Sequence, residues 1–361
     1  MSFSFGAHVR VTLFGQSHAD AVGVVIDGLP AGFTVDLATA QAFLARRAPQ
    51  GDGLSTARCE RDVPRILSGL SEGKTCGAPL CAVFEHQDAR RGDYAALRGR
   101  PRPSHADYPA YVKYGDAYDY AGGGQFSARL TVALCFAGAV CAQLLAARGV
   151  TVGAHILSVG DGCDAAFDPL CVSAEQLHAV QARAFPVLDE NKSEYLKEII
   201  RKVAKNGDSI GGVVECAAVG LPAGLGEPPF GGVENRITQA LFAVPAVRGV
   251  EFGAGFAAAR MRGSEHNDPY ALRGNAVVTV KNDAGGVLGG LTTGMPLLFR
   301  AAFKPTSSIA LPQQTVDLAA KAEVSISVAG RHDPCVAVRA VPCVEAAAAI
   351  ALCDLMLGGT I

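Results

Sequence analysis

Histidines and arginines in short polar stretches are the side chains of this sequence best suited to proton transfer and anion binding. Such stretches end predicted strands or open predicted helices at 15–18, 104–107, 122–129 and 330–335. Three of the eight histidines fall inside them: His18, His105 and His332. Two histidines among flexible polar residues suit a pair of proton donors. A single histidine is more often a satisfied structural residue, so the chemistry depends on whether these stretches meet in the fold.

The segment 121–147, AGGGQFSARLTVALCFAGAVCAQLLAA, places a three-glycine loop before a long apolar run. Free N–H groups at the start of a helix favour an anion, and the helix dipole adds to this. Arg129 would lie in the first turn, where the dipole disfavours a cation, and this indicates a negative ligand. The alternative is a strand–turn–helix corner in which Arg129 reaches solvent.

The run Lys304 to Ser308, KPTSS, offers a cation, a rigid turn and three hydroxyls, which suits a phosphate. A turn closed by its own hydroxyls explains the same residues equally well. The run is not a Walker A loop, and no G-x-G-x-x-G follows a strand in a βαβ context. H-E-x-x-H and paired Cys/His sets are absent from the sequence, so a metal site is not expected. Several arginines lie in or beside polar loops, and if they converge their ligand carries several negative charges: Arg46, Arg47, Arg102, Arg129 and Arg331.

Composition narrows the class of protein. The 361 residues are 49% hydrophobic and 18% charged, with a net charge of −2, which is typical of a globular protein. Nucleic acid and membranes are therefore not expected as partners. The N-terminus does not have the form of a secretory signal. Eleven cysteines without a C-x-x-C pair predict reduced thiols in a cytoplasmic protein.

These polar stretches must be positioned by a mixture of strands and helices. Alternating or buried apolar runs predict strands at 9–14, 22–32, 150–160, 209–219, 247–268 and 297–308. Helical patterns cover 36–47 with Asp36 as N-cap, the segment after Gly124, 173–205 ending on Gly207, 233–244 and 344–357. The polar segment 87–120 lacks periodicity and is expected to be a functional loop, while 48–58 forms another loop. Regular βαβ alternation is missing, which favours an α+β fold with antiparallel sheets packed on long central helices.

The pentapeptide GLPAG follows a predicted strand twice, at 28–32 and at 220–224. We therefore interpret residues 1–361 as a single domain with a possible internal pseudo-duplication, its halves roughly 1–160 and 208–361.

Eight segments taken together in this order resemble chorismate synthase: GQSHADAVGVVIDGLPAG, RPSHADY, GGGQFSARLT, GDSIGG, GLPAGLGEP, LGGLTTG, FKPTSS and GRHDPCVAVRAVP. The resemblance spans the chain from Phe14 to the C-terminal helix. It implies a β-α-β sandwich, usually assembled as a homotetramer. It also implies a carbon–oxygen lyase of the shikimate pathway, which serves aromatic amino acid biosynthesis. The reaction is the anti-1,4 elimination of phosphate from 5-enolpyruvylshikimate 3-phosphate, giving chorismate. Reduced FMN is required although there is no net redox change.

The resemblance also implies roles for particular residues. His18 would protonate the departing phosphate, His105 would keep the flavin in its working protonation state, and Asp333 would assist proton removal at the flavin. Ser17 and Ser127 would relay or position protons. FMN would lie against Gln125, Phe126, Ser127, Ala246, Gly289, Lys304, Pro305, Thr306, Ser307, Ser308 and Arg331. The anionic groups of the substrate would be held by Arg47, Arg102 and Arg129.

The chain departs from the usual family pattern at several positions of the expected site: Gln16, Ala19, Gly53, Gln125, Phe126, Leu130 and Pro245. The lost charges balance and all the proposed proton-transfer residues are retained, so we expect an active enzyme, with weaker affinity for FMN or substrate. A relative that binds flavin or an anionic metabolite without catalysis is the alternative. NADPH is expected to act only indirectly, through an external flavin reductase, because the sequence has no dinucleotide fingerprint. Self-reduction of the flavin with NADPH is a third possibility.

Overall fold

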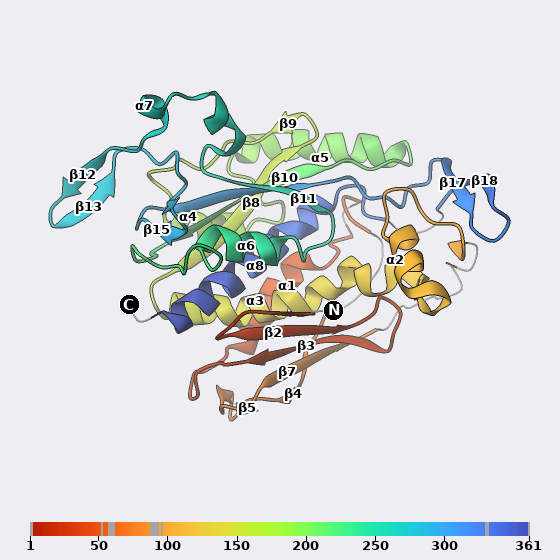
Figure 1. Ribbon diagram of the computed structural model, residues 1–361, viewed down its shortest axis with the longest axis horizontal. Coiled ribbons are helices and arrows are strands. Elements are labelled where there is room, and N and C mark those ends of the chain that lie inside the picture. Colours follow the sequence, from red (N-terminus) through yellow and green to blue (C-terminus); the bar gives the residue numbers. More distant parts are fainter. Residues whose placement is uncertain are drawn as a thin grey trace.

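The computed structural model describes residues 3–51, 53–56, 62–86, 94, 97–328 and 332–359. Figure 1 shows two antiparallel sheets with a layer of long helices between them. The helix layer contains α1 (Leu37–Arg47), α3 (Thr131–Ala146), α6 (Val233–Leu241) and α8 (Val336–Gly358). This is the α+β sandwich expected from the sequence.

Within the described residues each main sheet has five strands. The first has the order β1 (Ser4–Phe5), β2 (Arg10–Gly15), β3 (Ala21–Asp27), β7 (Leu80–Glu85) and β4 (Arg65–Ser68). The second has the order β11 (Val247–Phe252), β16 (Leu297–Phe303), β10 (Gly212–Val219), β8 (Thr151–Val159) and β9 (Gly162–Cys163). Helices α4 (Ala174–Gln181) and α5 (Glu190–Lys205) cover the outer face of the second sheet (Figure 1).

Smaller elements lie at the edges of the sandwich. They are α2 (Asp107–Tyr114), α7 (Gly263–His266) and four hairpins of the described chain: β5–β6 (Leu70–Ser71, Lys74–Thr75), β12–β13 (Tyr270–Arg273, Ala276–Thr279), β14–β15 (Val287–Leu288, Leu291–Thr292) and β17–β18 (Gln313–Asp317, Ala322–Ile326). Figure 1 shows β12–β13 projecting from one end of the protein and β17–β18 from the other.

The two central helices, α3 and α8, lie between the two sheets and are apolar on nearly all sides. Among the described residues, Ala128–Ala146 and Val336–Gly358 are long and apolar enough to span a membrane, yet 83% and 89% of their apolar windows are buried in the protein. A helix buried on all sides needs no polar face. Close packing requires small residues where α3 and α8 cross, since a Cβ added to Gly138 would lie 2.2 Å from the Cβ of Ala346. The helix after Gly124 is thus a core helix, as predicted.

Local signals fixed several element ends. Asp36 caps α1 by accepting hydrogen bonds from the N–H groups of Ala38 and Thr39, and α1 ends at Arg47 as predicted. Gly207 follows the C-terminus of α5 with a φ of +72°, which is the predicted terminator.

Other expectations were wrong. The C-terminal helix begins at Val336, eight residues before the predicted start, and continues through Pro342. Tight burial between the sheets stabilises this proline-containing turn despite its lost hydrogen bond. The segment 173–205 is split into α4 and α5, the expected loop 87–120 contains α2, and within 247–268 the strand stops at Phe252.

The repeated pentapeptide forms the same turn twice. The N–H of Gly32 donates to the carbonyl of Thr75, and the N–H of Gly224 donates to that of Thr292, each at 2.7 Å. The Thr75 hydroxyl then donates to the carbonyl of Pro30, as the Thr292 hydroxyl does to that of Pro222. This likeness supports the internal pseudo-duplication, which stays a prediction.

Candidate functional site

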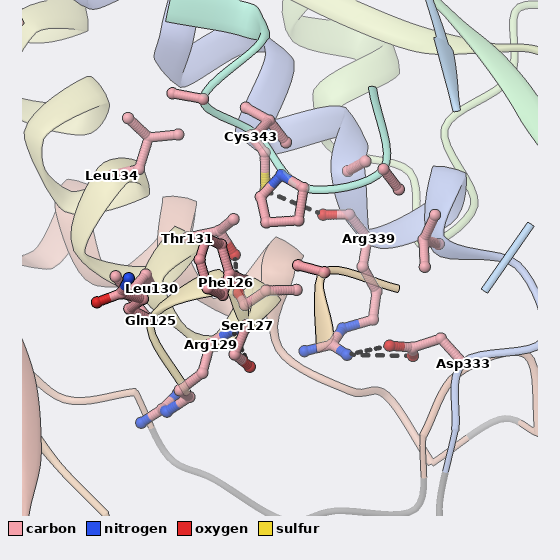
Figure 2. Close-up of a pocket in the computed structure, with 18 of the residues that line it drawn as sticks. Gln125, Phe126, Ser127, Arg129, Leu130, Thr131, Leu134, Asp333, Arg339 and Cys343 are labelled. Carbon is pink, nitrogen blue, oxygen red and sulfur yellow. Dashed lines mark hydrogen bonds and ion pairs between the residues drawn. The ribbon is translucent and has the colours of Figure 1, made fainter. Parts of the chain in front are cut away.

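A cavity of about 770 Å³ opens where the polar stretches of the sequence meet. Its wall comes from the glycine loop before α3, the C-terminal end of α6, residues 304 and 306–308 after β16, and the start of α8. Figure 2 shows part of this wall, with the side chains of Arg129, Asp333 and Arg339 around it. These three side chains give one part of the wall charged groups of both signs, whereas Phe126, Leu134 and Val244 provide apolar surface.

The three-glycine loop lies between two histidines. A Cβ added to Gly122 would fall 2.3 Å from Cε1 of His18, and one added to Gly123 would fall 3.2 Å from Nε2 of His105. Both glycines have positive φ angles, +60° and +93°. Only a residue without a side chain fits this close approach in this conformation. The loop is fixed to the end of β2 by the N–H of Ser17, which donates to the carbonyl of Gly124 at 3.0 Å.

His105 is held by the buried carboxylate of Asp107. Nδ1 of His105 lies 2.7 Å from Oδ1 of Asp107, so a proton on Nδ1 donates to the carboxylate and Nε2 is left facing Gly123. Arg102 also donates to Asp107 through Nε at 2.7 Å and through Nη2 at 2.9 Å, and the Tyr118 hydroxyl donates as well. Burial raises the pKa of Asp107, but the hydrogen bonds from Arg102 and His105 outweigh it and hold this pKa well below its usual range.

Arg47 and Arg129 share the buried carboxylate of Asp62. Arg47 donates to Oδ2 of Asp62 at 2.8 Å, and Arg129 donates to Oδ1. Arg47 also donates to the Thr131 hydroxyl at 3.1 Å and to the carbonyl of Ala128 at 3.0 Å. Burial alone would raise the pKa of Asp62. The two guanidinium groups have the larger, opposite effect and lower this pKa below its usual value, so the carboxyl stays ionised. One negative charge between two positive ones leaves an excess of positive charge at this wall.

Asp333 lies opposite and is paired with Arg339 from the first turns of α8. Arg339 donates to both carboxylate oxygens, at 3.1 and 2.8 Å (Figure 2). The N–H of Thr56 donates to Oδ1 at 2.9 Å. Burial, the largest cause, lowers the pKa of Arg339. Asp333 therefore has a fixed orientation beside the cavity.

The run 304–308 joins the other parts of the site. Lys304 donates to the Ser307 hydroxyl at 2.8 Å, and this hydroxyl donates to the carbonyl of Ser104 at 3.0 Å. The Thr306 hydroxyl donates to the carbonyl of Asp333 at 2.7 Å. Burial and the nearby Arg248 lower the pKa of Lys304. An anion bound at Lys304 would offset this loss of solvation, so the pattern favours an anionic ligand.

Comparison with known proteins agrees with this geometry. The family model described as chorismate synthase matches residues 9–357. A chorismate synthase of Lancefieldella parvula is 44% identical over 99% of this chain and 96% of its own length. One of Thermococcus gammatolerans is 46% identical over 98% and 97%. The chain belongs to the chorismate synthase family.

A solved structure supports the same conclusion. A crystal structure of chorismate synthase superposes with a TM-score of 0.76 at 27% identity, covering 98% of this chain and 94% of that chain. The fold of the chorismate synthase family is therefore shared along nearly the full length.

The structure brings most of the expected site residues to one cavity. Those that line it are His105, Asp333, Ser127, Gln125, Phe126, Ala246, Lys304, Thr306, Ser307, Ser308, Arg47, Arg102 and Arg129. Ser17 and His18 are buried just behind Gly122, which is part of the lining. Arg331 lies outside the described residues.

Two expected flavin contacts are not placed at this cavity. Gly289 is an exposed residue of the turn between β14 and β15, next to the N-terminal end of α6, whereas the cavity adjoins the C-terminal end of that helix. Pro305 lies behind the wall against Gly211, where it shapes the turn that presents its neighbours.

Sequence reasoning missed the groups that hold the site together. Arg129 does not reach solvent, because it is buried and paired with Asp62. Arg339 was hidden by the misplaced start of α8, although its spacing from Asp333 suits a pair across the first helical turns. Cys343, which no polar stretch indicated, also lines the cavity, together with His332 of the stretch 330–335.

Proposed function

We propose that this member of the chorismate synthase family converts 5-enolpyruvylshikimate 3-phosphate to chorismate and phosphate with reduced FMN. The observation that carries the proposal is the meeting of His105, Asp333 and the arginines at one cavity, with His18 behind its glycine wall. The substrate bears one phosphate and two carboxylates, which matches a wall rich in guanidinium groups.

The residues present fit a flavin beside an anionic substrate. The cavity volume lies in the upper part of the range of about 300–1,000 Å³ seen for small-molecule sites. Apolar surface from Phe126, Leu134 and Val244 suits a flat ring, while Lys304 and the hydroxyls after it suit the FMN phosphate. Reduced FMN, when bound, would supply electron density to the breaking carbon–oxygen bond and regain it as the product forms.

The protein's own groups would bind, orient and move protons. Arg47, Arg102 and Arg129 would hold the anionic groups of the substrate, and their buried carboxylate partners fix them before binding, which reduces the cost of ordering. Ser127, whose oxygen accepts from the N–H of Arg129, would help to fix that arginine.

Proton transfer is assigned to three side chains. His18 would donate a proton to the departing phosphate past Gly122, with Ser17 beside it. The Ser17 hydroxyl is buried and has no hydrogen-bond partner among the described residues, which fits a relay group that awaits a ligand. Asp333 would assist proton removal at the flavin, and His105 would present Nε2 to the flavin.

We also propose a source of reduced flavin, an assembly and a cellular location for this protein. Reduced flavin would come from an external reductase that uses NADPH, the assembly would be a homotetramer, and the location would be the cytoplasm. The ten cysteines that the structure describes are all free thiols, which supports a reducing compartment.

The test is an anaerobic assay of the purified protein with 5-enolpyruvylshikimate 3-phosphate and chemically reduced FMN. Chorismate absorbance and phosphate release are followed together, and we expect both only with reduced flavin. A second reaction with NADPH and oxidised FMN is expected to stay silent, whereas turnover there would show self-reduction. Silence in both, with flavin binding confirmed, would instead support the non-catalytic alternative.

A further inference from the structure

Two pairs of thiols cross the contact between α3 and α8 in the part of the chain that the structure describes. The sulfur atoms of Cys135 and Cys343 are 3.7 Å apart, and the Cys141 thiol interacts with that of Cys353. All four are buried. They differ in one respect: Cys343 lines the large cavity, whereas the other three are not part of its lining (Figure 2).

The surroundings of Cys343 favour its thiolate form. The Cys135 thiol donates a hydrogen bond to the Cys343 sulfur, and this bond, with the nearby guanidinium groups of Arg47 and Arg339 and the Thr131 hydroxyl, lowers the pKa of Cys343 to about 7 against the effect of burial. Burial, by contrast, raises the pKa of Cys135 well above its usual range. The pair thus has one thiol suited to attack and one that keeps its proton.

We propose that Cys343 is an oxidant-sensitive modification site in the cavity wall, that its oxidants are hydroperoxides, and that Cys135 is its resolving thiol. The Cys343 sulfur attacks one peroxide oxygen, the O–O bond breaks, and the other oxygen leaves as hydroxide and becomes water. Cys135 then attacks the sulfenic acid, an S–S bond forms, and a second water leaves. The two thiols lose two electrons and two protons, and hydrogen peroxide is reduced to two waters. A dithiol reductant reverses the bond.

Closing this bond disturbs the anion-binding wall. A disulfide is about 2.05 Å long, so the sulfur atoms must approach by about 1.7 Å from their distance of 3.7 Å. Cys343 currently donates to the carbonyl of Arg339 at 3.5 Å and interacts with the Thr131 hydroxyl, which in turn accepts from Arg47. Once the disulfide has formed, Cys343 has neither a proton to donate to the Arg339 carbonyl nor a negative charge facing Arg47 and Arg339. Oxidation is therefore expected to weaken anion binding reversibly, and this consequence for turnover rests on the proposed function.

The test treats the full-length protein with hydrogen peroxide and maps its cysteine peptides by mass spectrometry without reduction. We expect a cross-linked pair of peptides containing Cys135 and Cys343, lighter by two hydrogen atoms than their sum and lost with dithiothreitol. In Cys135→Ser the cross-link is expected to be absent, and Cys343 sulfenic acid is then trapped by dimedone. Cys141→Ser is the matched control at the same helix contact and is expected to retain the Cys135–Cys343 cross-link.

Two results would overturn the proposal. One is equal cross-linking of Cys141 to Cys353 in the wild type, because the cavity would then confer no selectivity. The other is reduced Cys343 in samples whose exposed Cys76, Cys163 and Cys171 have been oxidised. Both are read from wild-type protein, so a variant that fails to fold leaves the test intact. A preparation that cross-links but never forms chorismate would count against the proposed function alone.

Discussion

At the scale of single side chains, Asp107 sets the orientation of His105. Both residues lie in the RPSHADY stretch. Replacing Asp107 with Asn places an N–H group against the donors of Arg102 and removes the negative charge that holds the Nδ1 proton of His105. We expect kcat to fall by about 10²-fold, in the range of a lost acid–base group, with a smaller change in KM. Steady-state kinetics across pH measure this.

Asp317→Asn is the control for that substitution. Asp317 forms an Arg–Asp pair with Arg100 at 3.0 Å on β17, away from the cavity. Equal losses of kcat in the two variants would mean that Asp107 acts only through folding and does not position His105.

Gly122 separates His18 from the cavity, and its substitution tests that arrangement. In Gly122→Ala the new Cβ would collide with His18 at 2.3 Å, and the positive φ adds about 1 kcal/mol of backbone strain. We expect turnover to fall by at least about 10²-fold, because a catalytic group displaced by an ångström loses that much. Chorismate formation and flavin binding are measured together, and flavin binding is expected to persist.

Gly115→Ala provides a matched control for the backbone cost. Gly115 also has a positive φ, +58°, and a Cβ added there meets nothing within 4 Å. Its ψ of −144°, against 12° at Gly122, suits a side chain less, so Gly115→Ala is expected to carry at least as much backbone strain and still to keep its turnover. If the two alanine variants were equally active, His18 would have no catalytic part.

The strands of the second sheet carry a chain of charges that links three neighbours in register. Glu215 of β10 is paired with His155 of β8 on one side and with Arg300 of β16 on the other. Nε2 of His155 lies 3.0 Å from Glu215, and Nδ1 lies 3.2 Å from Asp164. Burial lowers the pKa of His155, but the two carboxylates outweigh it and raise the pKa above its usual 6.5. The folded protein therefore retains a proton there that the unfolded chain releases.

This proton makes stability depend on pH in a definite direction. Because the pKa is higher in the folded state, the contribution of His155 is complete below about pH 6.5 and is lost as pH rises through the folded pKa. We expect His155→Gln to lower the free energy of unfolding by about 3–5 kcal/mol below pH 6.5, with a smaller difference above it. Denaturant unfolding between pH 6 and 9 measures the difference. The exposed His178→Gln is the control, and a difference independent of pH in His155→Gln would contradict the assignment.

The sequence predicted element ends that are set by neighbouring residues. Asp36 at the start of α1 and Gly207 after α5 are such cases, because a helix cap involves only the residues of the adjoining turn. The start of α8 could not be predicted, because Pro342 signals a helix end locally while burial between two sheets keeps the helix intact. The helix α2 was missed because its short exposed segment has no apolar periodicity.

The same limit explains the candidate site. Polar stretches at strand and helix ends predicted His105, Asp333 and the arginines as site residues, and all of these that the structure describes, apart from Arg46, line one cavity. Their roles stay predictions. The partner of Arg47 and Arg129 could not be predicted, because Asp62 is 15 and 67 residues away and only the packing of α1 against α3 brings the three together. The position of Gly289 away from the cavity could not be predicted either, because a glycine turn in a matching motif does not indicate which end of α6 it adjoins.

The protein as a whole carries an exposed apolar hairpin that a monomer would not be expected to need. On β12–β13, Leu272 and Val277 are directly opposite each other and are 75% and 62% exposed, and Tyr270 on the same face is 68% exposed. Figure 1 shows this hairpin standing away from the body of the protein. Exposed apolar surface of this kind marks contacts between proteins, and the expected homotetramer supplies a partner in a second copy of the chain.

We therefore expect Leu272→Glu combined with Val277→Glu to convert the assembly to smaller species, because two charges would be buried at the subunit contact without partners. Light scattering coupled to size-exclusion chromatography measures the mass. Val112→Glu is the control, since Val112 is 66% exposed on α2, far along the chain from the hairpin. A wild-type monomer, or a double variant with unchanged mass, would show that the hairpin does not hold the assembly together. If the mass falls while the thermal midpoint of unfolding is retained, each chain is stable without its partners. The cavity and its charged pairs are then formed within one chain, as the packing of α1, α3 and α8 implies.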